Sequence, residues 1–423
     1  MSYPRQFIAG LTCAALLFVA APAVSPAAET LRLDALIARA EAANPGAAAM
    51  RARYEASRER IPRAGALEDP MLMTGFMAVE VDNFAFDRIP MTTKDIGISQ
   101  KIPFYGKRGL REDAARYESE AVEAEYREKL LDVRAEVKKA YFELWYIKKA
   151  QETVDKNMAL AGSLREVAQT RYSVGKGPFG DVLKAQLEET GLVDRKLELR
   201  KDERTMRAML GALTGSDMPS EGEVEDIATA NVEIDKDALV SRATGNRPAI
   251  QAADARVRKG GKMVELARKD YYPDFEAAFT YSQTERLADG MYQSDRISGQ
   301  LKFNLPVWWS TKLGPGVREA ASERAMAESE RESGITEIMY RVDSILGEVE
   351  QAERTMKLYR DIAVPQATES LDALLAGYEV GRSDFMALVD ARRMLYDYEL
   401  GYYKAMAGRE KSVAELEAVT GGF

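Results

Sequence analysis

Few side chains in this sequence have the chemistry of a catalytic or metal-binding centre. The chain of 423 residues contains no histidine, and its one cysteine is Cys13, close to the N-terminus. Histidine is the commonest general base and the commonest metal ligand in proteins. The composition therefore argues against an enzyme, and we predict neither a catalytic residue nor a bound cofactor.

A row of methionines is a weak candidate for binding a metal ion. Met71, Met73 and Met77 stand at odd positions of a stretch over 71–81 that reads as extended, so they share one face of a strand. Thioether sulfur is a soft ligand that suits Cu(I). Methionine is also a plain apolar filler, and such a face could simply contact lipid. The sequence leaves both interpretations open.

Neither a nucleotide nor a nucleic acid is expected as a ligand. Gly175, Gly177 and Gly180 match the spacing G-x-G-x-x-G, but the dinucleotide-binding loop follows a strand in a βαβ unit. Here a long helical pattern precedes the glycines, and Pro178 lies among them. The net charge of −9 and the pI of about 5.1 lack the basic footprint of a nucleic-acid-binding protein.

The glycine-rich segment is instead a turn that occurs twice. Residues 171–186 align without a gap with residues 377–392, so that Tyr172 matches Tyr378 at an offset of 206. The tips of the two turns are Val174, Gly175 and Lys176 in the first copy and Val380, Gly381 and Arg382 in the second. Each copy separates two long helical patterns, which predicts two helical hairpins.

The helical hairpins belong to two tandem structural repeats. Pro70 matches Pro273, and Pro103 matches Pro306, at a common offset of 203. A repeat this long decides the fold class before any single motif does. The first repeat is predicted over 28–215, with strands over 71–81 and 93–102 and helices over 107–172 and 181–213. A linker over 216–236 follows, and the second repeat, 237–423, has strands over 274–284 and 295–305 and helices over 317–377 and 385–419. Pro365 should bend the third of these long helices.

The N-terminus is predicted to be a signal peptide over residues 1–27. Arg5 supplies a positive charge, residues 7–19 form an apolar run shorter than a membrane span, and small residues follow. Cys13 raises the question of a lipid anchor, but Thr12 is a poor residue before a lipidated cysteine and the apolar run continues past it. We therefore expect an exported mature chain.

The predicted strands alternate between apolar and polar side chains, as the strands of an outer-membrane barrel do. Four strands cannot close a barrel, and open sheet edges do not occur in lipid. The chain therefore either forms a soluble sandwich or shares a barrel between copies. Three copies would supply twelve strands, and a barrel of that size leaves an aqueous lumen.

These features together resemble the TolC-type outer-membrane factors. The resemblance rests on the tandem Tyr-x-Val-Gly turns, the strands that end in residues 102–104 and 305–307, and the signal peptide. The segment 100–107, Gln-Lys-Ile-Pro-Phe-Tyr-Gly-Lys, looks most like the branch found beside heavy-metal efflux pumps. The resemblance implies a mainly α fold with a β-barrel contribution, in which a trimeric twelve-strand barrel continues into an α-helical tunnel. It also implies a homotrimer in the outer membrane of a Gram-negative-type cell, surrounded by lipid. A periplasmic adaptor and an inner-membrane pump, of the resistance–nodulation–division type in the metal branch, would be its partners.

The resemblance also suggests roles for residues of the turns. In relatives the hairpins form the periplasmic tip, where the adaptor docks and the duct closes, and an acid of the first tip bonds the tyrosine of the second. Those positions match Asp181 and Tyr378. Relatives narrow the entrance with two acids one turn apart, of which this chain keeps Asp390, has Ala387 at the earlier position, and carries Asp384 three residues before it. The alternative is that each acid is an exposed charge on a solvated helix and has no role at the entrance.

The function expected from the sequence is a passive exit duct in a tripartite efflux system, for heavy-metal cations or small toxic compounds. Two alternatives stay open, namely a soluble periplasmic coiled-coil scaffold without a pore, and an export duct for a secreted protein. The sequence does not fix the cargo.

Overall fold

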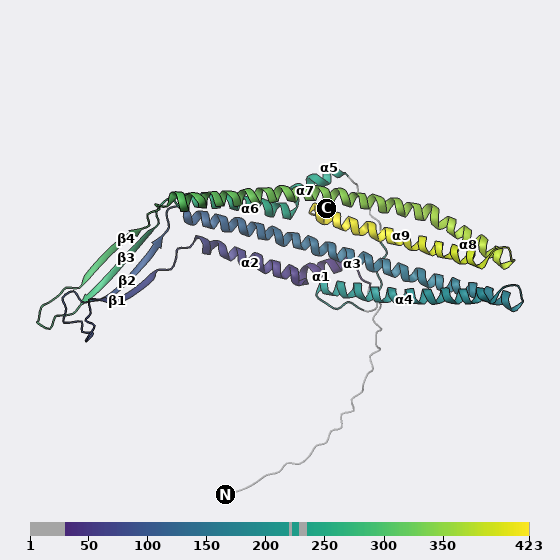
Figure 1. Cartoon of the computed structure of the whole chain (residues 1–423), viewed down its shortest axis with the longest axis horizontal. Coiled ribbons are helices and arrows are strands. Elements are labelled where there is room, and N and C mark those ends of the chain that lie inside the picture. Colours follow the sequence, from purple (N-terminus) through teal and green to yellow (C-terminus); the bar gives the residue numbers. More distant parts are fainter. Residues whose placement is uncertain (1–29, 220–221, 228–234, 423) are drawn as a thin grey trace, which may run out of the picture.

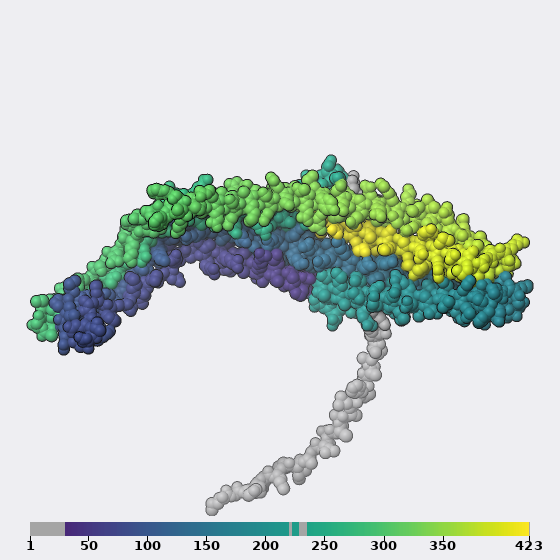
Figure 2. Space-filling model, viewed as in Figure 1, coloured from purple at the N-terminus to yellow at the C-terminus, as the bar shows by residue number. Residues whose placement is uncertain are grey.

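The protein is an elongated helical body with a small sheet at one end and two helical hairpins at the other (Figure 1). The computed structural model describes residues 30–219, 222–227 and 235–422. The predicted signal peptide, with Cys13, lies outside these residues. The space-filling view shows that the whole body is bowed along its length (Figure 2). The expected fold class, mainly helical with four strands, is confirmed.

The first repeat contains four helices and two strands. They are α1 (Leu33–Ala43), α2 (Pro45–Gly65), β1 (Met71–Met77), β2 (Thr93–Ile102), α3 (Lys107–Ser173) and α4 (Phe179–Thr214). At 1.5 Å per residue, the 67 residues of α3 span about 100 Å. The strand predicted over 71–81 is shorter than expected, because Ala78 has φ +57°, which takes the chain out of the extended conformation.

The second repeat follows the same order with an interrupted long helix. Its elements are α5 (Lys236–Asn246), α6 (Pro248–Lys269), β3 (Phe275–Thr284), β4 (Arg296–Phe303), the π-helix η1 (Trp309–Leu313), α7 (Gly314–Leu358), the π-helix η2 (Tyr359–Ala363), α8 (Val364–Glu379) and α9 (Phe385–Thr420). The helix expected over 317–377 thus contains the π turn η2. This turn ends two residues before Pro365, whose missing N–H and bulky ring disturb the regular helical ladder at this point.

The four strands form one antiparallel sheet in the order β1-β2-β3-β4. Register and alternation assign the side chains to two unlike faces. The polar face carries Asp95, Ser99, Thr280, Ser282, Ser298 and Gln300, and the apolar face carries Ile96, Ile98, Phe279, Tyr281, Ile297 and Leu301. The apolar face is exposed, with Ile297 80% and Ile96 51% exposed, whereas the polar face is shielded only on the two central strands, as at Ser99, which is 5% exposed. A water-soluble sheet would bury this face.

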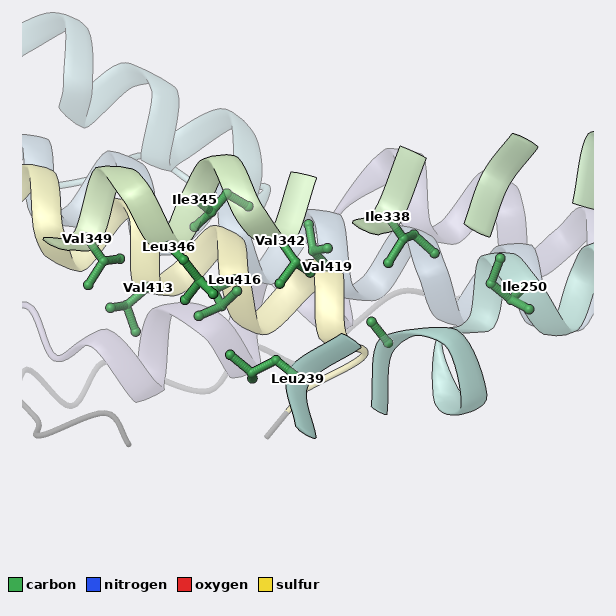
Figure 3. Packing of buried hydrophobic residues seen from close by; sticks show 11 residues of the cluster. Leu239, Ile250, Ile338, Val342, Ile345, Leu346, Val349, Val413, Leu416 and Val419 are labelled. Atoms are coloured by element: carbon green, nitrogen blue, oxygen red, sulfur yellow. The ribbon is translucent and has the colours of Figure 1, made fainter. Parts of the chain in front are cut away.

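The helices are held together by separate apolar clusters rather than by one core. One cluster joins α5, α6, α7 and α9 through residues such as Leu239, Val342 and Leu416 (Figure 3). A matching cluster in the first repeat joins α1, α3 and α4 and contains Leu36 and Leu210. Leu36 and Leu239 are repeat partners, as are Leu210 and Leu416, so the same packing is built twice.

The junction between sheet and helices is fixed by a buried cation. Lys107, at the start of α3, is 2% exposed and lies 2.9 Å from Asp274 and 3.2 Å from Asp270. A buried charge needs such partners, because desolvating it alone is costly. Aromatic side chains surround the junction, where Trp308 and Trp309 are exposed and Phe104 stacks on Tyr272.

Candidate functional site

Both hairpin turns share one backbone form. Gly175 has φ +71° and Gly381 has φ +80°, a left-handed conformation that glycine adopts without the penalty of a Cβ atom. In each turn an N–H beyond the glycine closes onto a carbonyl of the last helical turn at 2.8 Å, from Lys176 to Arg171 and from Arg382 to Gly377. This is the Schellman arrangement that ends a helix. The repeated sequence therefore specifies the same helix stop twice.

The tips of the turns are free to contact other molecules. Val174 and Val380 are 61% and 69% exposed, and Gly175, Lys176, Gly381 and Arg382 are also exposed. Both tips lie at the end of the molecule opposite the sheet (Figure 1). Each presents one apolar and one basic side chain next to its glycine.

The hydrogen bond expected between the two hairpins is present. The Tyr378 hydroxyl, at the end of α8, donates to Asp181 Oδ2, in the first turn of α4, at 3.0 Å. Tyr378 is 3% and Asp181 is 9% exposed. Burial, followed by the contact with the Asp181 carboxylate, raises the pKa of Tyr378 to about 12. The hydroxyl is therefore protonated, as a donor must be, over the physiological range.

A second contact between the hairpins comes from Arg171, for which the sequence suggested no role. Its Nη1 donates to the backbone carbonyl of Tyr378 at 2.5 Å and to that of Glu379 at 2.9 Å. The guanidinium also lies over the Tyr378 ring, 4.8 Å from its centroid. The sequence repeat offers one indication of a special role for Arg171. The equivalent position in the second copy is Gly377, so only the first copy has an arginine there.

An ion-pair group joins α4 to α9 about two helical turns from the contact between Tyr378 and Asp181. Glu188 accepts from Arg392 at 2.5 Å and from Arg393 Nε at 3.1 Å. The Arg392 side chain is only 3% exposed, and this burial lowers its pKa, whereas Glu188 raises the pKa of Arg393. Nothing in the spacing of these residues indicated the contact, since they are more than 200 residues apart in the sequence.

The repeated aromatic pair of the turns has two different environments. Tyr172 and Phe179 lie 5.2 Å apart in the first hairpin, and their partners Tyr378 and Phe385 lie 5.4 Å apart in the second. The first pair is about half exposed, at 48% and 50%, whereas the second is buried among α3, α4 and α8. The hairpins are thus alike in their turns and unlike in their contacts.

The acids expected to narrow the entrance lie on the surface of α9. Asp384 is the N-cap of this helix and accepts from the Met386 N–H at 3.1 Å. Asp390 is exposed, and its negative charge helps to raise the pKa of Arg393. Ala387 is half-buried.

The methionine row lies on the polar face of the sheet. Met71, Met73 and Met77 pair with Ser99, Gly97 and Thr93 of β2, whose side chains point to the same side as Asp95. The three methionines are themselves exposed, at 58%, 38% and 58%, and lie on the face of the sheet opposite to Ile96 and Ile98. Within the described ranges, no three acidic, histidine or cysteine side chains gather as a metal site.

The arrangement defines a class of protein. None of the helices described here is long and apolar enough to cross a membrane. The repeated units of helix, strand pair and long helical hairpin, with an outward-facing apolar sheet, are those of an outer-membrane channel subunit that extends into the periplasm. The chain belongs to the outer membrane efflux protein family, whose sequence profile matches residues 36–216 and 239–422. This confirms the expected family and the expected location in the outer membrane.

Relatives and solved structures agree over nearly the whole chain. The cobalt-zinc-cadmium resistance protein CzcC of Cupriavidus metallidurans is 21% identical over 397 residues, which cover 93% of this chain and 91% of that protein. The structure of the outer membrane protein VceC from Vibrio cholerae superposes with a TM-score of 0.77 at 18% identity, covering 92% of this chain and 96% of that one. A structure of CusC gives a TM-score of 0.79 at 14% identity, covering 94% and 93%.

Proposed function

We propose that three copies of this chain form a passive exit duct of a tripartite efflux system. The observation that carries the proposal is the inverted polarity of the sheet, whose apolar face is exposed while its polar face is partly shielded. Four strands have two open edges, which lipid does not tolerate. Three sheets joined edge to edge would remove those edges, place the apolar face against lipid and enclose a polar lumen of twelve strands.

The two hairpins are proposed to be the gated inner end of this duct. The exposed tips, with Val174, Lys176, Val380 and Arg382, would dock the hairpins of a periplasmic adaptor. The buried bond from Tyr378 to Asp181 would hold the closed state, and docking would break it. Energy would come from the partner pump in the inner membrane.

The acids of α9 are proposed to act as rings in the trimer. Asp390 and Asp384 of three chains would face one another around the entrance and provide fixed negative charge. Such rings favour cations. The name of the relative CzcC, a cobalt-zinc-cadmium resistance protein, supports heavy-metal cations as the cargo class.

Conductance and fractionation test the duct. Purified protein added to a planar lipid bilayer should give discrete conductance steps, and the mature chain should fractionate with the outer membrane as a trimer after cross-linking. A soluble scaffold would give neither result, and its recovery as a monomer in the periplasmic fraction would refute the proposal. Asp390→Asn should reduce the preference of the pore for cations, with Asp372→Asn of the exposed α8 surface as the matched control.

A further inference from the structure

We propose that the junction between the sheet and the helices binds anionic phospholipid head groups in the leaflet of the outer membrane that faces the periplasm. This junction surface combines aromatic and cationic side chains from the segments where α6 ends and α7 begins, namely Arg268, Tyr271, Trp308, Trp309, Lys312 and Arg318. The proposal rests on the proposed function in one respect, namely that the apolar face of the sheet contacts lipid. It adds the class of lipid and the residues that select it.

The exposed apolar side chains of β4 continue past the end of the strand. Leu305, Val307, Trp308 and Trp309 are all more than half exposed. The chain has three tryptophans, and the third, Trp145, is buried among the helices. Tryptophan prefers the head-group level of a membrane, where its ring is in an apolar environment and its N–H remains hydrated. The boundary of the membrane should therefore run through this junction.

Cationic side chains lie beside the two exposed tryptophans, where the end of α6 and the start of α7 are side by side (Figure 1). Lys312 and Arg318 are exposed, and neither side chain forms an ion pair or a hydrogen bond with a described residue. Arg318 Nη1 and the Tyr271 hydroxyl lie 3.5 and 3.8 Å from one point, the position that a Cβ atom on Gly314 would take. The carbonyl oxygen of Trp309 is 2.9 Å from the same point. The cation, the hydroxyl and the tryptophan segment are therefore neighbours.

The carboxylates near the junction do not neutralise these cations. Asp270 and Asp274 are both paired with the buried Lys107. Arg268, in the last turn of α6, is a third exposed cation that forms no ion pair within the described ranges. Glu319 is exposed and has no ion pair with a described residue either, but it is one acid against three cations. The surface is therefore positive, and a phosphodiester matches it, since arginine can bind two phosphate oxygens at once.

The junction surface is a feature of the second repeat alone. The equivalent positions of the first repeat, at the offsets of 203 and 206, hold one glycine and two acids. They are Gly65 for Arg268, Glu68 for Tyr271 and Glu112 for Arg318. Acids at these positions would repel anionic head groups, so the positive surface does not follow from the fold. A trimer would carry three such surfaces, one for each chain.

Quenching of tryptophan fluorescence by brominated phospholipids tests the surface. The purified protein would be reconstituted into phosphatidylcholine vesicles that contain equal small fractions of brominated phosphatidylglycerol in one sample and brominated phosphatidylcholine in the other. Both lipids should quench Trp308 and Trp309, because bromine quenches at contact, and phosphatidylglycerol should do so at the lower mole fraction. The double variant Lys312→Gln/Arg318→Gln should lower the relative affinity for phosphatidylglycerol about fivefold for each cation removed.

The control Lys184→Gln/Arg200→Gln removes two exposed cations of α4 that have no ion pair with a described residue, and it should keep the wild-type preference. Equal quenching by the two lipids in the wild type, or a wild-type preference in Lys312→Gln/Arg318→Gln, would overturn the surface. Quenching by neither lipid would assign the tryptophans to a contact between subunits and would overturn it as well. Bilayer conductance on the same preparation separates the two proposals. A protein that conducts but shows no preference for phosphatidylglycerol refutes the junction surface alone, whereas one that does not conduct refutes the duct.

Discussion

Replacing Tyr378 by phenylalanine should loosen the closed state of the hairpins. The substitution removes the hydroxyl that donates to Asp181 Oδ2 at 3.0 Å and leaves the aromatic ring in place. The ring contact with Phe385 and the bonds from Arg171 to the backbone carbonyls of residues 378 and 379 do not need the hydroxyl, so they should survive. The change therefore isolates one hydrogen bond.

The size of the effect follows from the burial of the acceptor. A hydrogen bond to a charged group contributes about 1.5–3 kcal/mol, and the Asp181 carboxylate, 9% exposed, would be left without this donor. With about 1.4 kcal/mol for each factor of ten, one hairpin pair should open about 10- to 150-fold more readily. The free energies of the copies in an oligomer would add if they opened together.

Single-channel recording measures this directly. Tyr378→Phe should show a higher open probability or a larger conductance than the wild type in a planar bilayer. Tyr172→Phe is the matched control, because it changes the repeat partner, which is 48% exposed, and should leave the recordings unchanged. If Tyr378→Phe and the wild type gave the same conductance and open times, the latch role of the bond would be refuted.

Three further outcomes follow from the structure. Because the pKa of Tyr378 is raised to about 12 from 10.0, the closed contact should persist below about pH 10 and weaken as the pH rises toward 12, so open probability should increase in that window. Gly401→Ala should lower the free energy of unfolding by about 1–3 kcal/mol, since its Cβ would lie 2.6 Å from the ring of Tyr359 in η2. Glu188→Ala should cost about 3–5 kcal/mol in denaturant titrations, because it leaves the buried Arg392 charge unpaired.

Each of these outcomes has a control within the chain. The alkaline opening should be absent from Tyr378→Phe, and its persistence there would assign it to another group. Gly408→Ala, in the same helix α9 but with open space at the new Cβ, should be neutral or stabilise by up to about 1 kcal/mol. Equal unfolding midpoints for the two glycine variants would contradict the contact with Tyr359. Glu198→Ala breaks an exposed pair with Arg195 and should cost under about 1 kcal/mol.

The order of the elements could be predicted because the same order occurs in two tandem sequence repeats. Gly175 and Gly381 end their helices in a left-handed conformation that glycine adopts without penalty, and the apolar alternation of β3 and β4 has the period of a strand. The predicted element boundaries that are wrong lie where the local backbone geometry departs from a regular helix or strand. The positive φ of Ala78 ends β1 early, and η2 interrupts a stretch whose composition is helical throughout.

The contacts between hairpins were harder to predict, because they depend on how helices far apart in the sequence are packed. The hydrogen bond between Tyr378 and Asp181 could be predicted only from the resemblance to the TolC-type family. Arg171, Glu188 and Arg392 are ordinary charged residues on helical patterns, and only the packing of α3, α4, α8 and α9 brings them to their partners and buries Arg392. The face of the sheet that carries the methionine row could not be predicted either, because it depends on the register of β1 against β2.

The difference between the hairpins indicates where a closed entrance would begin to open. At the offset of 206, Asp181 corresponds to Ala387 and Arg171 corresponds to Gly377, so the second repeat has no counterpart of the two groups that hold Tyr378. In a trimer built with pseudo-symmetric neighbours, the hairpin contact within a chain would carry the hydrogen bond and the arginine. The equivalent contact between chains would place Tyr172 near the alanine and glycine and would have neither. The contact within a chain and the equivalent contact between chains would share their backbone geometry but not their polar contacts. The contact between chains should therefore separate first, and the hydrogen bond from Tyr378 should be the last to break.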